Sequence, residues 1–163
     1  MQQSHLTRDL TVLSSEDDVV DRYITFTQLN ASILRTSNAI GVYKGTQTLL
    51  LPKALYLDFA DLLLQEMLPV QLWIYIGLVS DENTNSAYTY GLKEFGKTEI
   101  EILNSDMQRS DLYDFVVAVT SYIVEYDAVL LDGQTIGFTA EQKIQISESK
   151  GKFLEGNSLK LKV

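Results

Sequence analysis

Residues 91–98 read GLKEFGKT and match the phosphate-loop pattern G-x-x-x-x-G-K-[ST] at every fixed position. In a phosphate loop, a strand ends in a glycine-rich turn, and the helix that follows directs its free N–H groups at the phosphates of a nucleotide. The chemistry that this spelling suggests is nucleotide binding or hydrolysis. It requires Lys97 and Thr98 to begin a helix.

The residues that follow the motif predict a strand instead of a helix. From Glu99 to Ile102, polar and apolar residues alternate, which is the period of a strand. Two carboxylates directly after Lys97 would also repel a triphosphate. We therefore expect a hairpin with Gly91 and Gly96 in its turn or in bulges, and no nucleotide binding through residues 91–98.

The sequence also contains a possible magnesium-organising partner for the phosphate loop. Residues 128–132 read AVLLD, an apolar run that ends in aspartate. However, Gly133 follows Asp132, and an Asp-Gly pair between apolar runs is a strong signal for a hairpin turn. This segment therefore predicts a turn and does not support an NTPase.

Three charged residues beside the motif form the only cluster that packing does not explain. Glu99 and Glu101 would share one strand face, about 7 Å apart, with Lys97 nearby. Such a pair could act in acid–base catalysis or bind a divalent cation, although a solvated strand face gives the same pattern. We name Lys97, Glu99 and Glu101 as candidate binding residues, and we assign no catalytic residue and no metal ligand.

Other site chemistries receive little support. Residues 81–86 alternate like a calcium loop, but Ser86 and Leu92 stand where that loop needs glycine and a bidentate glutamate. His5 is the only histidine, which argues against a Ser-His-Asp triad. The chain has no cysteine, so thiolate sites and disulfides are excluded. We expect no cofactor and no metal.

The charge of the chain limits its partners. Its 22 acidic and 13 basic residues give a net charge of -9, which repels nucleic acid and attracts a basic protein. Aromatic and basic residues do interleave in one stretch, as in some proteins that stack single-stranded bases: Tyr88, Tyr90, Lys93, Phe95 and Lys97. Because of the net charge, we interpret these aromatic residues as packing residues.

The length and the hydropathy pattern predict one soluble unit. The chain has 163 residues, enough for a single domain, which we place at residues 10–163 after a frayed end at residues 1–9. No apolar run approaches the roughly 20 residues of a membrane helix, and residues 1–10 lack the apolar core of a secretory signal. We therefore expect a cytoplasmic protein with no membrane partner.

The first half of the sequence predicts a ferredoxin-like order of elements, βαββαβ. Ser14 or Ser15 would cap the first helix, and Leu55 and Met67 are among the apolar positions of the second helix. Apolar residues on both faces of the last strand favour a central position in the sheet. The expected elements are a strand at 10–15, a helix from there to about 38, a hairpin at 39–51, a helix at 52–68 and a strand at 70–78.

The second half adds further strands and one more helix. The expected strands lie at 87–92, 97–103, 129–138, 142–148 and 158–163, and the helix lies near 110–126. The fold class is therefore α+β, with an antiparallel or mixed sheet and about three helices.

Several segments together resemble a bacterial domain-of-unknown-function family, number 4261. They read LPVQLWIYIGL, AYTYGLKEFGKTEIEIL, VLLDGQTIGFTAEQKIQIS and SLKLKV. The resemblance covers residues 10–163, and many members are longer at the N-terminus. It is most specific at Trp73, Thr89, Gly91, Phe95, Gly96, Glu99, Glu101, Asp132, Gly133, Thr135, Gly137 and Lys143. The family often has proline at the position of Thr98, which favours a coincidental phosphate-loop spelling. The resemblance implies a cytoplasmic α+β protein and brings no catalytic residues.

These observations favour a non-catalytic binding or interaction module. One version is an immunity-like protein that covers a basic protein partner. The alternative is a small-ligand or divalent-cation-dependent enzyme that uses Lys97, Glu99 and Glu101, and it requires a concave pocket around these side chains.

Overall fold

The computed structural model describes residues 18–137 and 143–163. Its helices are α1 (Val19–Thr36), α2 (Lys53–Ala60), α3 (Val70–Trp73) and α4 (Arg109–Glu125), with 3-10 turns η1 (Gly45–Gln47), η2 (Asp61–Gln65) and η3 (Leu92–Phe95). Its strands are β1 (Gly41–Lys44), β2 (Leu49–Pro52), β3 (Tyr75–Ser80), β4 (Asn85–Tyr90), β5 (Ile100–Ser105), β6 (Thr135–Ile136), β7 (Ile144–Lys150) and β8 (Asn157–Lys162). Within these ranges, no helix is both long and apolar enough to cross a bilayer.

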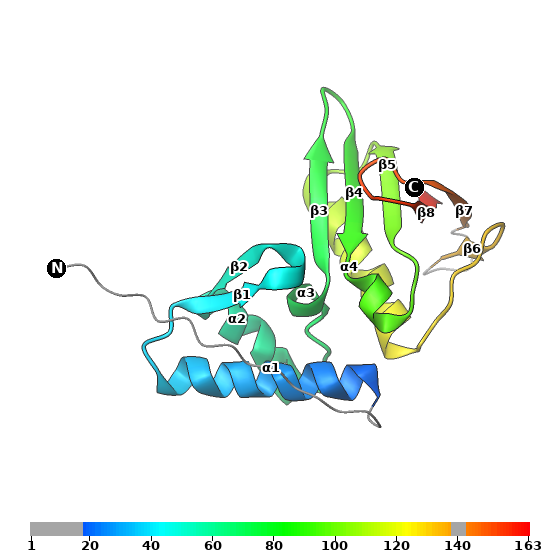
Figure 1. The fold of residues 1–163 in the computed structure, drawn as a ribbon. Helices are drawn as coiled ribbons and strands as arrows, with labels where there is room; N and C mark the ends of the chain where they lie inside the picture. The colour runs from blue at the N-terminus through cyan, green and yellow to red at the C-terminus, as the bar shows by residue number, and fades with distance from the viewer. Residues whose placement is uncertain (1–17, 138–142) are drawn as a thin grey trace.

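The strands form two separate sheets (Figure 1). The larger sheet has the order β3-β4-β5-β8-β7-β6, and it is antiparallel except for the parallel pair β5 and β8. Helix α4 packs against its β3 and β4 strands. The smaller sheet is the β1–β2 hairpin, which packs against α2, and α2 in turn packs against α1. The class is therefore α+β with a mixed sheet, as predicted.

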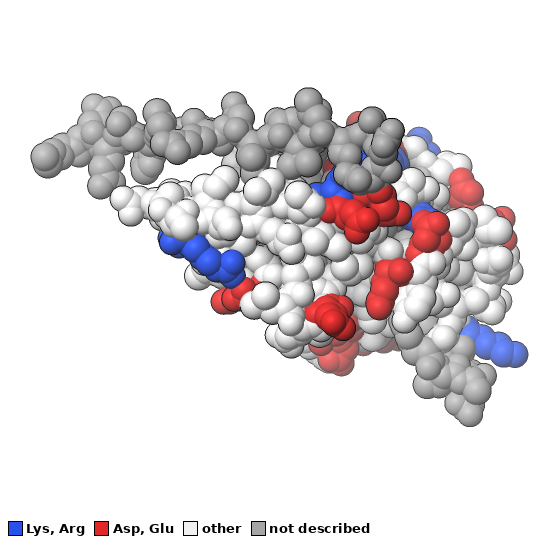
Figure 2. Space-filling view, turned by 90° about the horizontal axis from the view of Figure 1, so that it is seen from below, with Lys and Arg blue, Asp and Glu red and all other residues white. Residues whose placement is uncertain are grey.

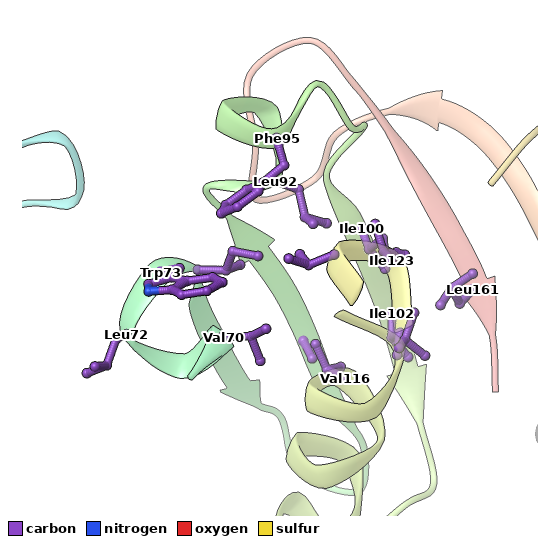
Figure 3. Close-up of a cluster of buried hydrophobic side chains, with 14 of the residues drawn as sticks. Val70, Leu72, Trp73, Leu92, Phe95, Ile100, Ile102, Val116, Ile123 and Leu161 are labelled. Carbon is purple, nitrogen blue, oxygen red and sulfur yellow. The ribbon is translucent and has the colours of Figure 1, made fainter. Parts of the chain in front are cut away.

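The main core lies between α4 and the large sheet. Leu112, Val116, Val119 and Ile123 recur at the spacing of one helix face and are buried. Figure 3 shows Val116 and Ile123 with the β5 residues Ile100 and Ile102 and with Leu161 of β8. Burying an aliphatic side chain of this size contributes about 1.5–3 kcal/mol. This packing holds α4 against the sheet along most of its length.

Trp73 connects α1 to the rest of the molecule. Its indole N–H donates a hydrogen bond of 2.9 Å to the hydroxyl of Thr27, a buried residue of α1. Its ring also lies 5.5 Å from that of Tyr23 on α1 and 6.0 Å from that of Phe95 in η3. Because a buried indole needs a hydrogen-bond acceptor, the Thr27 contact fixes the position of α1 as well as filling space.

The predicted strand at 70–78 is wrong in its first part. Residues Val70–Trp73 form the short helix α3, and β3 begins only at Tyr75. Val70, Leu72 and Trp73 are all buried, and a short run that is apolar on every side has no period that separates a strand from a helix. The predicted central position is not found either, because among the strands of residues 18–137 and 143–163 β3 lies at the edge of the sheet.

The ferredoxin-like arrangement is not formed. The elements from α1 to β3 follow the predicted order, apart from the additional α3, but the β1–β2 hairpin is not part of the sheet that contains β3. The second helix ends at Ala60 and continues as η2. Its predicted apolar positions Leu55 and Met67 are exposed, because Tyr56 and Ala60 are the buried residues of α2.

Helix α1 begins later than predicted. Its N-cap is Asp18, whose side chain accepts a 2.7 Å hydrogen bond from the backbone N–H of Val20, so neither Ser14 nor Ser15 is the cap. The frayed end at 1–9 and the strand at 10–15 lie outside the described residues. The single domain at 10–163 stays a prediction.

The second half follows the sequence prediction closely. Helix α4 and strands β4, β5, β7 and β8 lie at the expected places. Of the strand predicted at 129–138, the described residues up to 137 form only β6. Asp132 and Gly133 form the predicted turn, because the N–H of Gln134 donates to the carbonyl of Leu131, and Gly133 has a positive φ of 78°.

Candidate functional site

The segment 91–98 is a turn between two strands. Gly91 and Gly96 flank η3 with φ values of 127° and 70°, which favour glycine, and Ile100 begins β5. Lys97 and Thr98 therefore do not begin a helix. The segment has no ring of free helical N–H groups to hold a phosphate, and the hairpin prediction is confirmed.

Glu99 is buried and holds this turn in place. It is 3% exposed, and one carboxylate oxygen accepts hydrogen bonds from the backbone N–H groups of Gly91, at 2.7 Å, and Lys93, at 3.3 Å. The other oxygen accepts a 2.7 Å bond from the hydroxyl of Thr89, which itself accepts from the N–H of Ile100. These donors compensate the cost of burying the carboxylate.

Glu101 is fully buried and anchors a different loop. Its carboxylate accepts from the backbone N–H groups of Lys152, at 3.0 Å, and Phe153, at 2.6 Å. The Ser158 hydroxyl and the Lys160 ammonium each lie 2.8 Å away. Burial alone would raise the pKa of Glu101, but these donors outweigh burial and lower the pKa from 4.5 to about 2.

Lys97 has partners of its own. Its ammonium group lies 2.5 Å from the carboxylate of Asp127 and 2.9 Å from the carbonyl of the same residue. The structure therefore does not bring Lys97, Glu99 and Glu101 together around one opening. Among the described residues, no group of His, Cys, Asp and Glu side chains is arranged to hold a metal ion.

The other candidate motifs also have structural roles. Residues 81–84 are the turn of the β3–β4 hairpin, in which the N–H of Asp81 donates to the carbonyl of Thr84. The ring of Phe95 packs on Tyr23, and the ring of Tyr88 packs on Phe153 at 5.4 Å. Phe95 and Tyr88 are thus engaged in packing, as predicted, whereas Tyr90 is 45% exposed.

A cleft of about 360 Å³ lies where α1 begins and α4 ends. Its floor is apolar, and acidic side chains lie around it. The apolar lining comes from Val19, Val20, Leu68, Phe95, Ile123 and Val124, and the charged lining from Asp18, Asp21, Lys97, Glu125 and Asp127.

The electrostatic potential of this cleft is negative. Four carboxylates face one ammonium group, and the contact of Lys97 with Asp127 neutralises that group. The last turn of α4 carries no basic residue, so the partial negative charge of its C-terminus adds to the charge of Glu125. Asp18, Asp21, Glu125 and Asp127 are exposed. Figure 2, which views the molecule from the α1 side, shows acidic side chains gathered on this face.

Sequence reasoning did not find this cleft. Its lining comes from four separate segments, at residues 18–21, 68, 95–97 and 123–127. Packing of α1 and η3 around Trp73 and Phe95 brings these segments together, and no local spacing reports such packing. The only available signal was the acidic ends of the two long helices, at Asp18 and Glu125.

The comparisons with known proteins identify the C-terminal part of the chain. Residues 88–162 match the family model described as Domain of unknown function (DUF4261). No curated protein and no solved structure matches the chain. The matched segment runs from β4 to β8 and includes Glu99 and Glu101, whereas Asp18, Asp21 and Leu68 of the cleft precede it. The match is thus shorter than the resemblance at residues 10–163.

Proposed function

We propose that this chain, which belongs to the DUF4261 family through residues 88–162, is a non-catalytic binding module for a basic protein segment. The observation that carries the proposal is the cleft between α1 and α4, which combines an apolar floor with acidic walls. A partner segment with lysine or arginine around an apolar side chain matches both features.

A basic partner would be held by short-range apolar contacts and attracted by long-range charge. Apolar residues of the partner would contact Val19 and Val20, which are half-buried, and this contact would add hydrophobic burial to the charge attraction. The carboxylates at Asp21 and Glu125 would set the orientation, and the net charge of -9 would speed the encounter. An immunity-like protein that covers a basic toxin is one form of this function. We place this function in the cytoplasm, in keeping with a chain that has no cysteine.

The alternative enzyme built on Lys97, Glu99 and Glu101 gains no support from the geometry. Both glutamates are buried, and internal donors surround their oxygens. The ammonium group of Lys97 contacts Asp127. A substrate or cation would have to displace these contacts before it reached either carboxylate.

The proposal is tested by calorimetry with a basic amphipathic probe. The probe is a synthetic helical peptide of about 14 residues, made of leucine and lysine. We expect Asp21→Asn/Glu125→Gln to weaken its binding about fivefold to tenfold, because each exposed charge contributes up to about 1 kcal/mol. Binding should also weaken as salt is raised from about 50 mM to about 300 mM.

A matched control separates the cleft from general acidity. Asp81→Asn/Glu82→Gln removes the same charge from the β3–β4 turn, outside the cleft, and we expect it to leave the affinity within about twofold. Equal weakening in both double variants, or no binding to any of the three proteins, would contradict the proposal.

A further inference from the structure

The two edges of the large sheet differ in how they are protected. One edge is β6, which has only two residues, and the other is β3, which has six. Native proteins protect long edges with charged side chains, proline or bulges, because a free edge exposes unpaired N–H and C=O groups. The residues of β3, Tyr75–Ser80, read YIGLVS and include no charge and no proline. Its register with β4 is regular along its whole length.

No described segment pairs with the outer side of β3. Its only strand partner within residues 18–137 and 143–163 is β4, and Figure 1 shows β3 extending beyond the β1–β2 hairpin. The hairpin contacts the chain just before β3 begins. There Lys44 donates to the carbonyls of Leu72 and Trp73, and Gln47 donates to the carbonyl of Trp73.

We propose that the free edge of β3 pairs with β3 of a second copy of this chain. The two strands run antiparallel around a twofold axis, and the sheet continues across the dimer. This inference is independent of the acidic cleft, which lies at α1 and α4.

The sequence of β3 is self-complementary in one register. Residues directly opposite in an antiparallel pair lie on the same face, so a twofold axis at Gly77 places Tyr75 opposite Val79 of the second copy. It also places Ile76 opposite Leu78. Aromatic residues facing β-branched residues are favourable cross-strand pairs. Tyr75 and Val79 are 37% and 41% exposed in the single chain, so the pairing would cover apolar surface.

Gly77 keeps the centre of this register flat. The ring of Tyr88 lies over it, and a Cβ atom at position 77 would come within 2.2 Å of that ring. Glycine therefore lets Tyr88 of the neighbouring strand lie against β3. At the axis, neither Gly77 adds a side chain to the sheet face on which the Tyr88 ring lies.

The edge strand carries no charge that would oppose a second copy. Two chains of net charge -9 repel each other, but β3 contains no carboxylate, so the register at Gly77 brings no like charges opposite each other along the paired residues 75–79. The same register places apolar residues opposite apolar residues on both faces of the strand, and this self-complementarity favours a second copy of β3 as the occupant.

The register is tested by disulfide trapping in a chain that has no cysteine of its own. Tyr75→Cys and Val79→Cys are prepared separately, mixed in equal amounts and oxidised. Opposite residues have Cα atoms about 4.5–5.5 Å apart, within the range for a disulfide. Two copies of the same position are offset by four residues, or about 13 Å, which is too far. We expect a disulfide-linked dimer in the mixture and none in either variant alone.

Sedimentation equilibrium of the wild-type chain provides the second readout. We expect the mass to rise from 18.4 kDa toward twice that value with concentration, and Val79→Asp to return it to the monomer with unchanged circular dichroism. The proposal is overturned by a wild-type monomer at every concentration, by a dimer that Val79→Asp leaves intact, or by equal trapping in the single-variant samples. Trapping in neither the mixture nor the single variants overturns it as well.

Discussion

Two groups of carboxylates in this molecule have opposite surroundings. Glu99 and Glu101 are buried, and each accepts hydrogen bonds from backbone N–H groups of a loop. Asp21, Glu125 and Asp127 are exposed around an apolar cleft. The buried pair stabilises the fold of residues 88–162, and the exposed group is available to a partner. The two glutamates that the sequence analysis named as candidate binding residues are therefore not the ones that face solvent.

The largest loss of stability is expected when Glu101, one of the two buried glutamates, is replaced. Glu101→Ala leaves the Lys160 ammonium group and the N–H groups of Lys152 and Phe153 without their acceptor. Removing one partner of a buried ion pair costs about 3–5 kcal/mol. We expect the free energy of unfolding, measured in urea, to fall by this amount, and Glu82→Ala on the exposed turn to change it little. A loss below about 1 kcal/mol would contradict the assigned role of Glu101.

Lowering the pH should reduce the free energy of unfolding by a comparable amount, because it protonates Glu101. The pKa of Glu101 is lowered from 4.5 to about 2 in the folded chain, so its stabilisation is complete above about pH 5 and disappears as the pH falls toward 2. The contribution is on the order of 3 kcal/mol. We expect the gap in unfolding free energy between wild type and Glu101→Gln to narrow between pH 6 and pH 2.5. If the difference in unfolding free energy between the two proteins does not change with pH, Glu101 is not the group whose protonation lowers the stability.

Replacing Glu99, the other buried glutamate, should reduce the free energy of unfolding by less. Glu99→Ala leaves the N–H of Gly91 and the hydroxyl of Thr89 without an acceptor, but it separates no ion pair. An unsatisfied buried donor costs about 1–3 kcal/mol. We expect a loss of that size in thermal or urea unfolding, with Glu99→Gln intermediate because its amide oxygen still accepts. A loss larger than that of Glu101→Ala would reverse the ranking.

The smallest effect is expected in the exposed group. The partner of Lys97, Asp127, has a side chain that is 93% exposed, and such pairs contribute about 0–1 kcal/mol. We expect Asp127→Asn to change the unfolding free energy by no more than this, and Lys97→Ala to cost more, because the Lys97 side chain is only 10% exposed and its buried stem is lost as well. We also expect Mg-ATP to produce no thermal shift in wild type or in Lys97→Ala. A nucleotide-dependent shift that Lys97→Ala abolishes would overturn the assignment of residues 91–98 as a turn.

Parts of this account follow directly from the sequence. Strict alternation after Lys97 predicted β5 against the phosphate-loop spelling, and Asp132-Gly133 predicted the turn before β6. Periodicity could not separate α3 from a strand, because Val70, Leu72, Trp73 and Ile74 are all buried and follow neither period clearly. Periodicity also could not show that a loop covers Glu101, since these contacts join Glu101 to residues more than fifty positions away. The cleft was inaccessible to sequence reasoning for the same reason.

The central claim is that the exposed carboxylates of the cleft, and not the acidity of the whole chain, select a basic partner. Capture from native lysate at low salt tests it with three immobilised proteins: wild type, Asp21→Asn/Glu125→Gln and Asp81→Asn/Glu82→Gln. The account predicts that wild type and the Asp81/Glu82 variant retain the same basic protein, that salt elutes it, and that the cleft variant loses it. Retention of that protein by the cleft variant, or no salt-sensitive partner on wild type, would contradict the claim.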